Sequence, residues 1–414
     1  MPEPILIEDF TDFDKSLLYK LGSSYYASKG LKAFSKASGS YIPNEISNSY
    51  PHARAFVELC KKIILDKKID KFKILEFGSG SGIFARHALL AAKDLGIEKN
   101  IVFYLSDITS KTFDEIKSIG VLNDFQEHTH YEFLELNLLN IPNTYSKTFD
   151  AVLLNYVFDA LPTLPLRYSE EGNLEKLQIQ IWQNPDDKSL NENNLLEDSN
   201  LLSRLLIQEL WVKYSPSQGL EQKYFDLLSK DLVDHRSKIL YPYAALSATE
   251  MLLDLLDDNG FIYVSDMPLD KNDPGIFRMF ANAIVNYFSE PLITKLITNQ
   301  NYCGYVVQDN SFLRMFYFKN QNLFLELLDL MKELYEKTST VDIYYDIRKA
   351  LDSISSPHSK DLIEFLCKKF LEFDKHSCVS YFMQAKLFEL IGETEKAQIA
   401  RTKAQKLDFL GNFS

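Results

Sequence analysis

A run of alternating glycines is the feature of this sequence that most directly suggests ligand chemistry. It lies in Lys73–Phe84, which reads Lys-Ile-Leu-Glu-Phe-Gly-Ser-Gly-Ser-Gly-Ile-Phe. The apolar residues around Glu76 predict a short buried strand. The glycines Gly78, Gly80 and Gly82 predict a tight turn into a helix, because glycine adopts φ > 0 at little cost. Backbone N–H groups at such a helix start face any ligand that lies over the turn.

The residues around the glycines narrow the class of ligand. Ile83 stands where the NAD fingerprint G-x-G-x-x-G requires its third glycine, and no Gly-Lys-Ser/Thr follows, as a P-loop requires. Glu76 is a poor partner for phosphate and a good one for an ammonium or a hydroxyl group. The pattern acid-x-Gly-x-Gly-x-Gly resembles motif I of the class I S-adenosylmethionine (SAM) methyltransferases. The alternative is an ordinary glycine-rich turn.

Polar residues end the next two predicted strands, at the sheet edge where ligands of open α/β sheets bind. Asp107 follows the strand 101–105 at the distance from the glycine turn that a βαβ unit requires, and its carboxylate can accept both ribose hydroxyls of an adenosyl ligand. Asn137, followed by Leu138, ends the strand 131–136 and can read an adenine edge. The alternatives are a helix cap at Asp107 or Thr109 and a turn formed by Asn137.

The fourth predicted strand, 149–154, ends in the segment 155–162, which reads Asn-Tyr-Val-Phe-Asp-Ala-Leu-Pro. Methyl transfer from a sulfonium requires alignment of nucleophile, methyl group and sulfur, and sometimes removal of a proton. Asn155 and Asp159 can orient or deprotonate a nitrogen nucleophile. Alternatively, Asp159 caps the next turn while Phe158 and Leu161 belong to the core. The predicted SAM-binding residues are Glu76, Gly78, Gly80, Gly82, Asp107, Asn137, Leu138 and Asn155.

Residues 155–162 resemble the Asn-Glu-x-x-Asp-Ala-Leu-Pro signature of the MidA-like methyltransferases, a family that includes the mitochondrial complex I assembly factor that methylates a protein arginine. The loop 41–47, Tyr-Ile-Pro-Asn-Glu-Ile-Ser, is similar to the family's N-terminal Ser-Pro-Glu-Ile-Ser loop. The resemblance covers roughly residues 20–320. It implies methyl transfer to a protein side chain, with arginine as one candidate, or to a small molecule.

Tyr156 stands where the MidA-like family has an acidic residue. A guanidinium acceptor favours a pair of carboxylates, so this departure leaves the acceptor open. Glu45 or Asp159 can substitute for the missing acid. The predicted catalytic residues are Asp159, Asn155 and Glu45.

The strands that carry these groups alternate with helices, which predicts a doubly wound, Rossmann-like α/β sheet of the class I methyltransferase type. Later strands are predicted at 261–264 and as an antiparallel hairpin across 302–318. We expect an N-terminal helical cover at 1–70, the methyltransferase domain at 71–320 and a C-terminal helical extension at 321–414. An insertion at 166–240 is predicted to hold a strand at 177–182, a polar acidic stretch at 184–200, and helices at 201–214 and 223–233.

The C-terminal extension places small and aromatic residues at positions typical of a tetratricopeptide repeat (TPR): Ala385, Phe388, Gly392, Ala397 and Ala404. No second copy of the repeat precedes it, so a plain helical hairpin is an equal alternative. Either can bind a protein partner or cap the domain. This leaves a second hypothesis, a methyltransferase-fold scaffold that no longer catalyses and that binds a partner through these helices. The altered Tyr156 favours the scaffold, and the intact Glu76 and Asp107 oppose it.

Composition constrains the partners further. A chain of 414 residues predicts two or three domains, and its net charge of −13 argues against a nucleic-acid partner. The four cysteines are scattered, without Cys-x-x-Cys or zinc spacing, which favours reduced thiols and no metal site. No signal-like N-terminus and no apolar run of membrane-spanning length occurs. We therefore expect a cytoplasmic protein that uses SAM as its cofactor and has no membrane partner.

Overall fold

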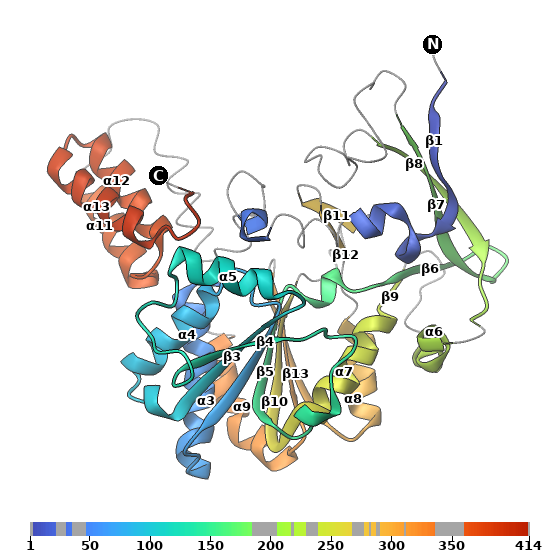
Figure 1. Cartoon of the computed structure of the whole chain (residues 1–414), viewed down its shortest axis with the longest axis horizontal. Coiled ribbons are helices and arrows are strands. Elements are labelled where there is room, and N and C mark those ends of the chain that lie inside the picture. The colour runs from blue at the N-terminus through green and yellow to red at the C-terminus, as the bar shows by residue number, and fades with distance from the viewer. Residues whose placement is uncertain are drawn as a thin grey trace.

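The computed structural model describes residues 3–21, 30–34, 47–183, 205–216, 219–228, 239–266, 277–280, 283–286, 290–309, 312–335 and 360–412. Its centre is a seven-stranded sheet of order β13-β14-β10-β5-β2-β3-β4 (Figure 1). The strands are β2 (Phe72–Phe77), β3 (Ile101–Asp107), β4 (Tyr131–Glu135), β5 (Phe149–Asn155), β10 (Leu256–Asp266), β13 (Cys303–Asp309) and β14 (Phe312–Phe318).

The pairing in this sheet confirms the predicted Rossmann-like fold. Strands β4, β3, β2, β5 and β10 run parallel to their neighbours, whereas β14 is antiparallel to both β10 and β13. The closing antiparallel hairpin follows the pattern of class I methyltransferases. Since the five parallel strands all end at one edge, the polar residues that follow them are brought to that edge.

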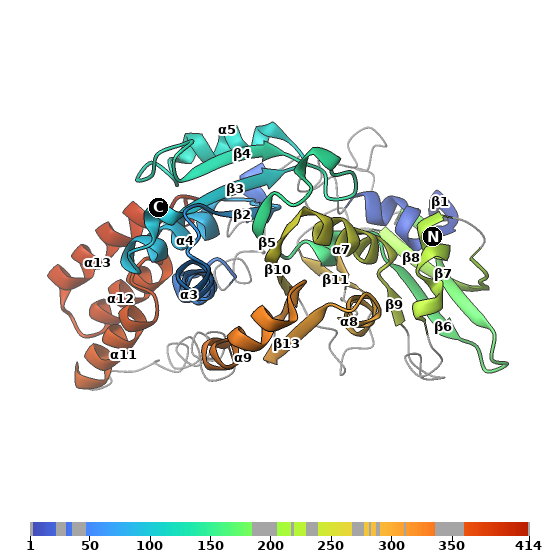
Figure 2. The same ribbon diagram turned by 90° about the horizontal axis from the view of Figure 1, so that it is seen from below.

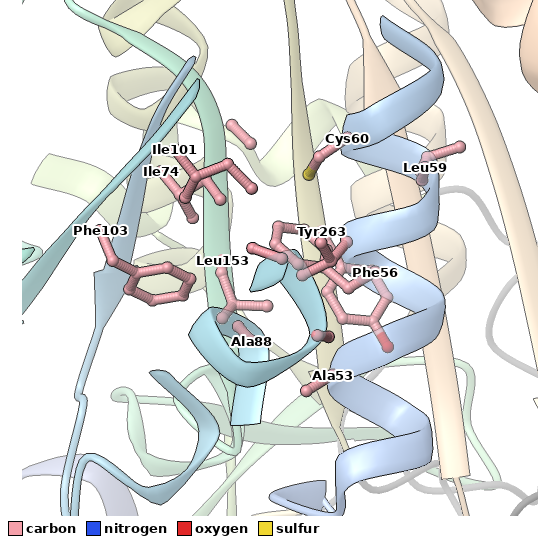
Figure 3. Close-up of a cluster of buried hydrophobic side chains, with 14 of the residues drawn as sticks. Ala53, Phe56, Leu59, Cys60, Ile74, Ala88, Ile101, Phe103, Leu153 and Tyr263 are labelled. Atoms are coloured by element: carbon pink, nitrogen blue, oxygen red, sulfur yellow. The ribbon is translucent and has the colours of Figure 1, made fainter. Parts of the chain in front are cut away.

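Helices cover both faces of the central sheet (Figure 2). On one face, α3 (Tyr50–Lys67), α4 (Ile83–Asp94) and α9 (Gln321–Tyr335) share a core with the strands, and α5 (Ser110–Ile119) contributes to it; on the other, α7 (Tyr243–Leu255) and α8 (Glu290–Asn299) do so. Figure 3 shows Phe56 and Cys60 of α3 beside Tyr263 and Leu153 of the sheet. Helix α3 lies in the region 1–70 that was expected to be helical, and its apolar side lies against the strands.

Helix α9 shows that the helical region after the hairpin has two parts. Leu323, Leu327, Met331 and Tyr335 of α9 are buried in the core of the central sheet. A separate group follows, made of α11 (Lys360–Phe373), α12 (Cys378–Leu390) and α13 (Thr394–Leu407). Ala385, Ala397 and Ala404 are buried, and Gly392 turns the chain with φ of +73°. Small side chains thus allow close packing of α12 and α13, as the sequence predicted.

A second sheet corrects two sequence predictions. It contains β1 (Ile5–Asp12), β6 (Leu164–Tyr168), β7 (Leu174–Gln183), β8 (Leu205–Lys213) and β9 (Ile239–Tyr241). Residues 5–12 were predicted as part of a helical cover and 205–213 as part of a helix, and both are strands. The reason is tertiary: β1 and β8 both pair antiparallel with β7, whose alternating Leu177, Ile179 and Ile181 form the buried face.

Short elements complete the described chain. They are η1 (Phe13–Lys15), η2 (Gly30–Phe34), η4 (Glu98–Asn100), η5 (Asn143–Tyr145), η6 (Phe158–Ala160), α6 (Gly219–Lys223), η9 (Phe225–Leu227), and the hairpin of β11 (Phe277–Phe280) and β12 (Ala283–Asn286). The helix predicted at 223–233 is reduced to the end of α6 and to η9 within the described residues, and the acidic stretch 184–200 lies outside them. No helix in the described part of the chain is both long and apolar enough to cross a bilayer.

Candidate active site

The glycine turn joins β2 to α4 as the sequence predicted. Gly78, Gly80 and Gly82 have φ of +63°, +50° and +70°, a region that side chains with a Cβ rarely adopt. A Cβ on Gly78 would lie 3.1 Å from Cγ2 of Val157, and one on Gly82 would lie 3.3 Å from Cγ2 of Ile116. Gly78 thus serves both the turn and its close approach to Val157 after β5, Gly80 serves the turn, and Gly82 is the N-cap of α4.

Two serines tie this turn to the neighbouring strand. The backbone N–H and the Oγ of Ser79 both donate to the carbonyl of Ser106, at 3.0 and 2.8 Å. The Oγ of Ser106 in turn donates to the carbonyl of Glu76 at 2.9 Å. These bonds hold the ends of β2 and β3 together. Sequence reasoning assigned neither serine a role, although small polar residues between glycines are a usable signal.

Glu76 lies beneath the turn and is almost fully buried, at 2% exposure. Burial raises the pKa of its carboxyl well above the usual value. Among the residues that the structure describes, no group donates a hydrogen bond to its Oε2. A buried carboxylate without a partner is costly, and a ligand ammonium would supply the missing donor and charge.

Asp107 is the last residue of β3 and lies beside the same glycine turn. The helix cap is Thr109, whose Oγ1 accepts from the N–H of Lys111 at 3.3 Å, so α5 does not need Asp107 as its cap. Burial raises the pKa of Asp107, and hydrogen bonds from the backbone of Ile108, Thr109 and Gly80 and from Thr112 oppose that shift. The interaction with Gly80 brings the carboxylate beside the middle glycine.

Asn137 and Leu138 follow β4. The Oδ1 of Asn137 accepts from the N–H of Leu139 at 2.9 Å, so the alternative of a turn-forming asparagine is observed. Its side-chain NH₂ can still donate to a ligand. Leu138 is buried in the core on the α7 face of the sheet.

Asn155 ends β5 and is paired in register with Ser265 of β10. Neither Oδ1 nor Nδ2 of Asn155 has a hydrogen-bond partner in the described part of the chain, and the same holds for the Oγ of Ser265, which is fully buried. Unsatisfied buried polar atoms are few in native proteins, so their concentration at adjacent strand ends points to a ligand site. Ser265 was not predicted as a site residue, although it directly follows the apolar run 261–264.

Two carboxyl groups meet beyond Asn155. The backbone N–H of Asp159, in η6, donates to Oδ2 of Asp266 at 3.2 Å, and both residues are buried. Burial and then the neighbouring Asp266 raise the pKa of Asp159 well above its usual value. Phe158 is also buried, in agreement with the alternative in which it belongs to the core. No pattern in the sequence indicates Asp266 as the partner of Asp159. The predicted catalytic residue Glu45 lies outside the described residues.

The chemistry of these groups suits a zwitterionic nucleoside better than a phosphate ligand. One acid lies under the glycine turn, a second lies beside it, and an amide and a hydroxyl with open hydrogen-bond capacity continue along the edge. A phosphate would instead meet the repulsion of two carboxylates.

Comparison with known proteins finds distant structural similarities. No protein-family model and no curated protein matches the chain. Similar solved structures include an uncharacterized Burkholderia thailandensis protein, with 12% identity, 70% of this chain and 79% of the other covered, and a TM-score of 0.43. Another protein of that organism, bound to S-adenosylhomocysteine (SAH), is 11% identical over 70% of this chain and 80% of its own, with a TM-score of 0.43.

The plantazolicin methyltransferase BpumL, in complex with SAH, is similar over 74% of this chain and 96% of its own, with 11% identity and a TM-score of 0.37. Similarity this distant does not establish a shared activity. Activity and substrate are therefore inferred from the site itself.

Proposed function

We propose that this protein is a SAM-dependent methyltransferase acting on a protein side chain or a small molecule. The observation that carries the proposal is the position of two acids around one glycine turn: Glu76 beneath it, without a partner for Oε2, and Asp107 beside Gly80. These are the groups that an amino-acid ammonium and a ribose would require. The chain's resemblance to MidA-like methyltransferases in residues 155–162 supports the same activity.

Each residue would hold one part of the cofactor. Ionised Glu76 accepts hydrogen bonds from the ammonium, Asp107 accepts them from the ribose hydroxyls, and the glycine turn admits the ligand close to the backbone. The NH₂ of Asn137 remains for the adenine edge. When bound, SAM supplies a methyl group on a positively charged sulfur.

The acid pair Asp159–Asp266 supports a nitrogen acceptor, with arginine as one candidate. Since burial and the second acid raise the pKa of Asp159, its carboxylate is a stronger base than an exposed aspartate. Asp159 would take the proton that the nitrogen releases. Asp266 provides the second carboxylate for which the sequence resemblance had no counterpart at Tyr156.

Binding is tested first, by isothermal titration of the full chain with SAM. We expect heat that saturates at one ligand per chain, and none in the double variant Gly78→Ala/Gly80→Ala, since a Cβ at φ > 0 distorts the turn. Equal heats in the two proteins would contradict the proposed site.

Catalysis is tested with SAM labelled in its methyl group and a cell lysate as the source of acceptors. We expect a labelled acceptor with the wild-type chain and little label with Asp107→Ala. SAM binding without any transfer would favour the scaffold hypothesis, and transfer that Asp107→Ala leaves unchanged would reject the proposed site.

A further inference from the structure

We infer that Ser265 belongs to the cofactor site and that, together with Asn155, it binds the carboxylate of the SAM amino-acid end. This inference rests on the proposed function and extends it, because the sequence predicted no contact from β10. The evidence is the register at the ends of the adjacent strands β2, β5 and β10.

The register places these groups in one row. Phe77 pairs with Leu154, so that Gly78 comes level with Asn155, and Asn155 pairs with Ser265. Register partners on neighbouring strands point to the same side of a sheet, and residues two positions apart share that side. The row therefore faces the same side as Leu153 and Tyr263, which Figure 3 shows among the side chains of α3 and α4.

Glu76 lies on that same side, one step lower, because it pairs with Leu153. An amino-acid zwitterion needs acceptors for its ammonium and donors for its carboxylate. Glu76 and Oδ1 of Asn155 can supply the acceptors, whereas Nδ2 of Asn155 and Oγ of Ser265 can supply the donors. All four atoms are buried, and of the Glu76 carboxyl it is Oε2 that has no hydrogen-bond partner within the described residues.

Charge along the row agrees with this division. Ser265 pairs on its other side with Arg314 of β14, which is 2% exposed. The row thus runs from the glycine turn, past Asn155 and Ser265, toward a buried guanidinium. A carboxylate held at Asn155 and Ser265 lies in the positive potential of Arg314, and an ammonium held at Glu76 lies farther from it.

Other serines at this edge show what a purely structural role looks like. The hydroxyls of Ser79 and Ser106 both donate to backbone carbonyls within the chain. The backbone carbonyl of Ser265 accepts from the N–H of Tyr156 at 2.9 Å, but its hydroxyl takes no part in that bond. A buried hydroxyl that does not support the backbone is better explained by a ligand.

The test compares two ligands that differ only at the amino-acid end. SAH carries that end, and 5′-methylthioadenosine lacks it. Titration calorimetry should show that Ser265→Ala weakens SAH binding by about tenfold, the effect of one hydrogen bond to a charged group, and leaves 5′-methylthioadenosine unchanged. Asn155→Asp should weaken SAH more, because it places a carboxylate against a carboxylate, and should likewise spare 5′-methylthioadenosine.

Thr249→Val is the control for loss of a buried hydroxyl. The Oγ1 of Thr249 donates to the carbonyl of Ala245 within α7, so its removal should change neither affinity. Circular dichroism and thermal melts establish that each variant is folded. Unchanged SAH affinity in Ser265→Ala, or an equal loss for both ligands, would overturn the inference alone. Failure of the wild-type chain to bind SAH would overturn the proposed function as well.

Discussion

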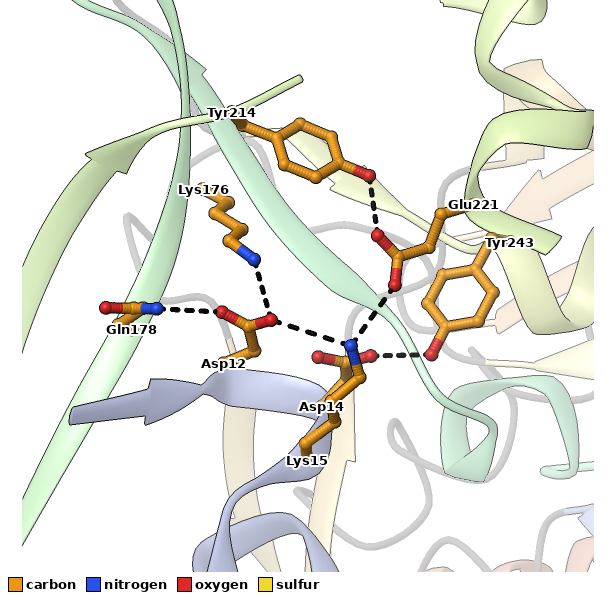
Figure 4. A network of polar contacts seen from close by, with 8 residues as sticks. All are labelled: Asp12, Asp14, Lys15, Lys176, Gln178, Tyr214, Glu221 and Tyr243. Atoms are coloured by element: carbon orange, nitrogen blue, oxygen red, sulfur yellow. Dashed lines mark hydrogen bonds and ion pairs between the residues drawn. The ribbon is translucent and has the colours of Figure 1, made fainter. Parts of the chain in front are cut away.

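The two sheets of this protein use the same kinds of polar residue in opposite ways. In the second sheet, the carboxylate of Asp12 accepts hydrogen bonds from Lys176 at 2.6 Å and from Gln178 at 3.0 Å (Figure 4). Lys15 forms ion pairs with Asp12 at 3.5 Å and with Glu221 at 3.4 Å. At the carboxyl edge of the central sheet, Glu76, Asn155 and Ser265 have atoms without a partner in the described residues. The first arrangement stabilises a fold, whereas the second leaves hydrogen-bond capacity for the proposed cofactor.

The pKa values of the carboxyl groups differ according to whether each group has hydrogen-bond partners. Burial opposes ionisation of Asp12, but the hydrogen bonds from Lys176 and Gln178 outweigh it and lower the pKa. Glu76 has burial alone, and its pKa is raised. Asp14 is an intermediate case, because only one of its carboxylate oxygens is paired. Tyr243 donates to its Oδ2 at 2.6 Å, but its Oδ1 has no partner among the described residues, and burial raises its pKa. The fully paired Asp12 thus supports the second sheet, whereas the unpaired Oε2 of Glu76 lies at the proposed cofactor site.

Among the substitutions considered, we expect the largest effect from replacing Asp159. We predict that Asp159→Asn lowers the rate of methyl transfer by about 10²- to 10⁴-fold, the usual contribution of a general base, and leaves SAH affinity unchanged. In the wild type, the rate should increase with pH through the raised pKa of this group, and the variant should lose that dependence. Single-turnover assays with labelled SAM measure both.

Asp258→Asn is the matched control for Asp159, since Asp258 is an exposed acid paired with Lys147 at 3.0 Å. It should keep the wild-type rate. A rate in Asp159→Asn within twofold of that control would show that the buried pair does not take part in catalysis.

At Glu76 we predict a loss of binding together with a gain in stability. Glu76→Gln should weaken SAH by about 10- to 100-fold, because the ammonium loses its charged partner. The ligand-free protein should melt at a higher temperature at pH 7.5, because a neutral amide avoids the cost of a buried carboxylate. The pKa of Glu76 is higher in the folded than in the unfolded chain, so this gain should disappear below pH 4.5, where both forms are protonated.

Calorimetry and melting curves in the absence and presence of SAH measure these effects. Asp12→Asn is the comparison from the second sheet and should leave SAH affinity unchanged. Weaker SAH binding with a lower melting temperature of the free protein would mean that Glu76 is structural.

The glycine turn gives a smaller effect. Gly78→Ala should destabilise the chain by about 1–3 kcal/mol, because it combines an unfavourable φ with a 3.1 Å contact to Val157. Gly96→Ala is the control, since Gly96 has φ of +74° but no atom within 4 Å of the added Cβ. Urea unfolding should show the larger loss for Gly78→Ala, and equal losses would show that Val157 yields without cost.

Sequence reasoning succeeded where structure is set locally. The strand before Gly78 and the turn after it depend on an apolar run and on glycine, both visible within a dozen residues. The strand β8 was missed because Leu205–Lys213 contains good helix formers, and its state is decided by pairing with β7. Likewise, Asp159 meets Asp266 across 107 residues, so the acid pair depends on the order of strands in the sheet.

The same limit explains why the pKa of each acid could not be predicted. Asp12 ends β1 and Glu76 lies near the end of β2, and the residues next to each acid in the sequence do not show whether its carboxyl group has a partner. Asp12 meets Lys176 and Gln178, more than 160 residues away, whereas the burial of Glu76 depends on the helices that cover the sheet. Whether a buried acid is matched is a property of the assembled core.

The smallest expected effect is on stability, at Asp12 of the second sheet. Asp12→Asn should lower the free energy of unfolding by about 1 kcal/mol at pH 7, because Lys176 loses a half-buried partner. The folded pKa of Asp12 is below the unfolded value of 3.8, so its stabilisation is present above that pH and is lost as the pH falls through the folded pKa. The stability difference between wild type and Asp12→Asn should therefore shrink in acid. The difference produced by Glu76→Gln, which has the opposite sign, should also vanish in acid but at a higher pH. Unfolding measured at a series of pH values tests both predictions. A stability difference between Asp12→Asn and the wild type that does not change with pH would show that the charge of Asp12 contributes no stability through its pair with Lys176.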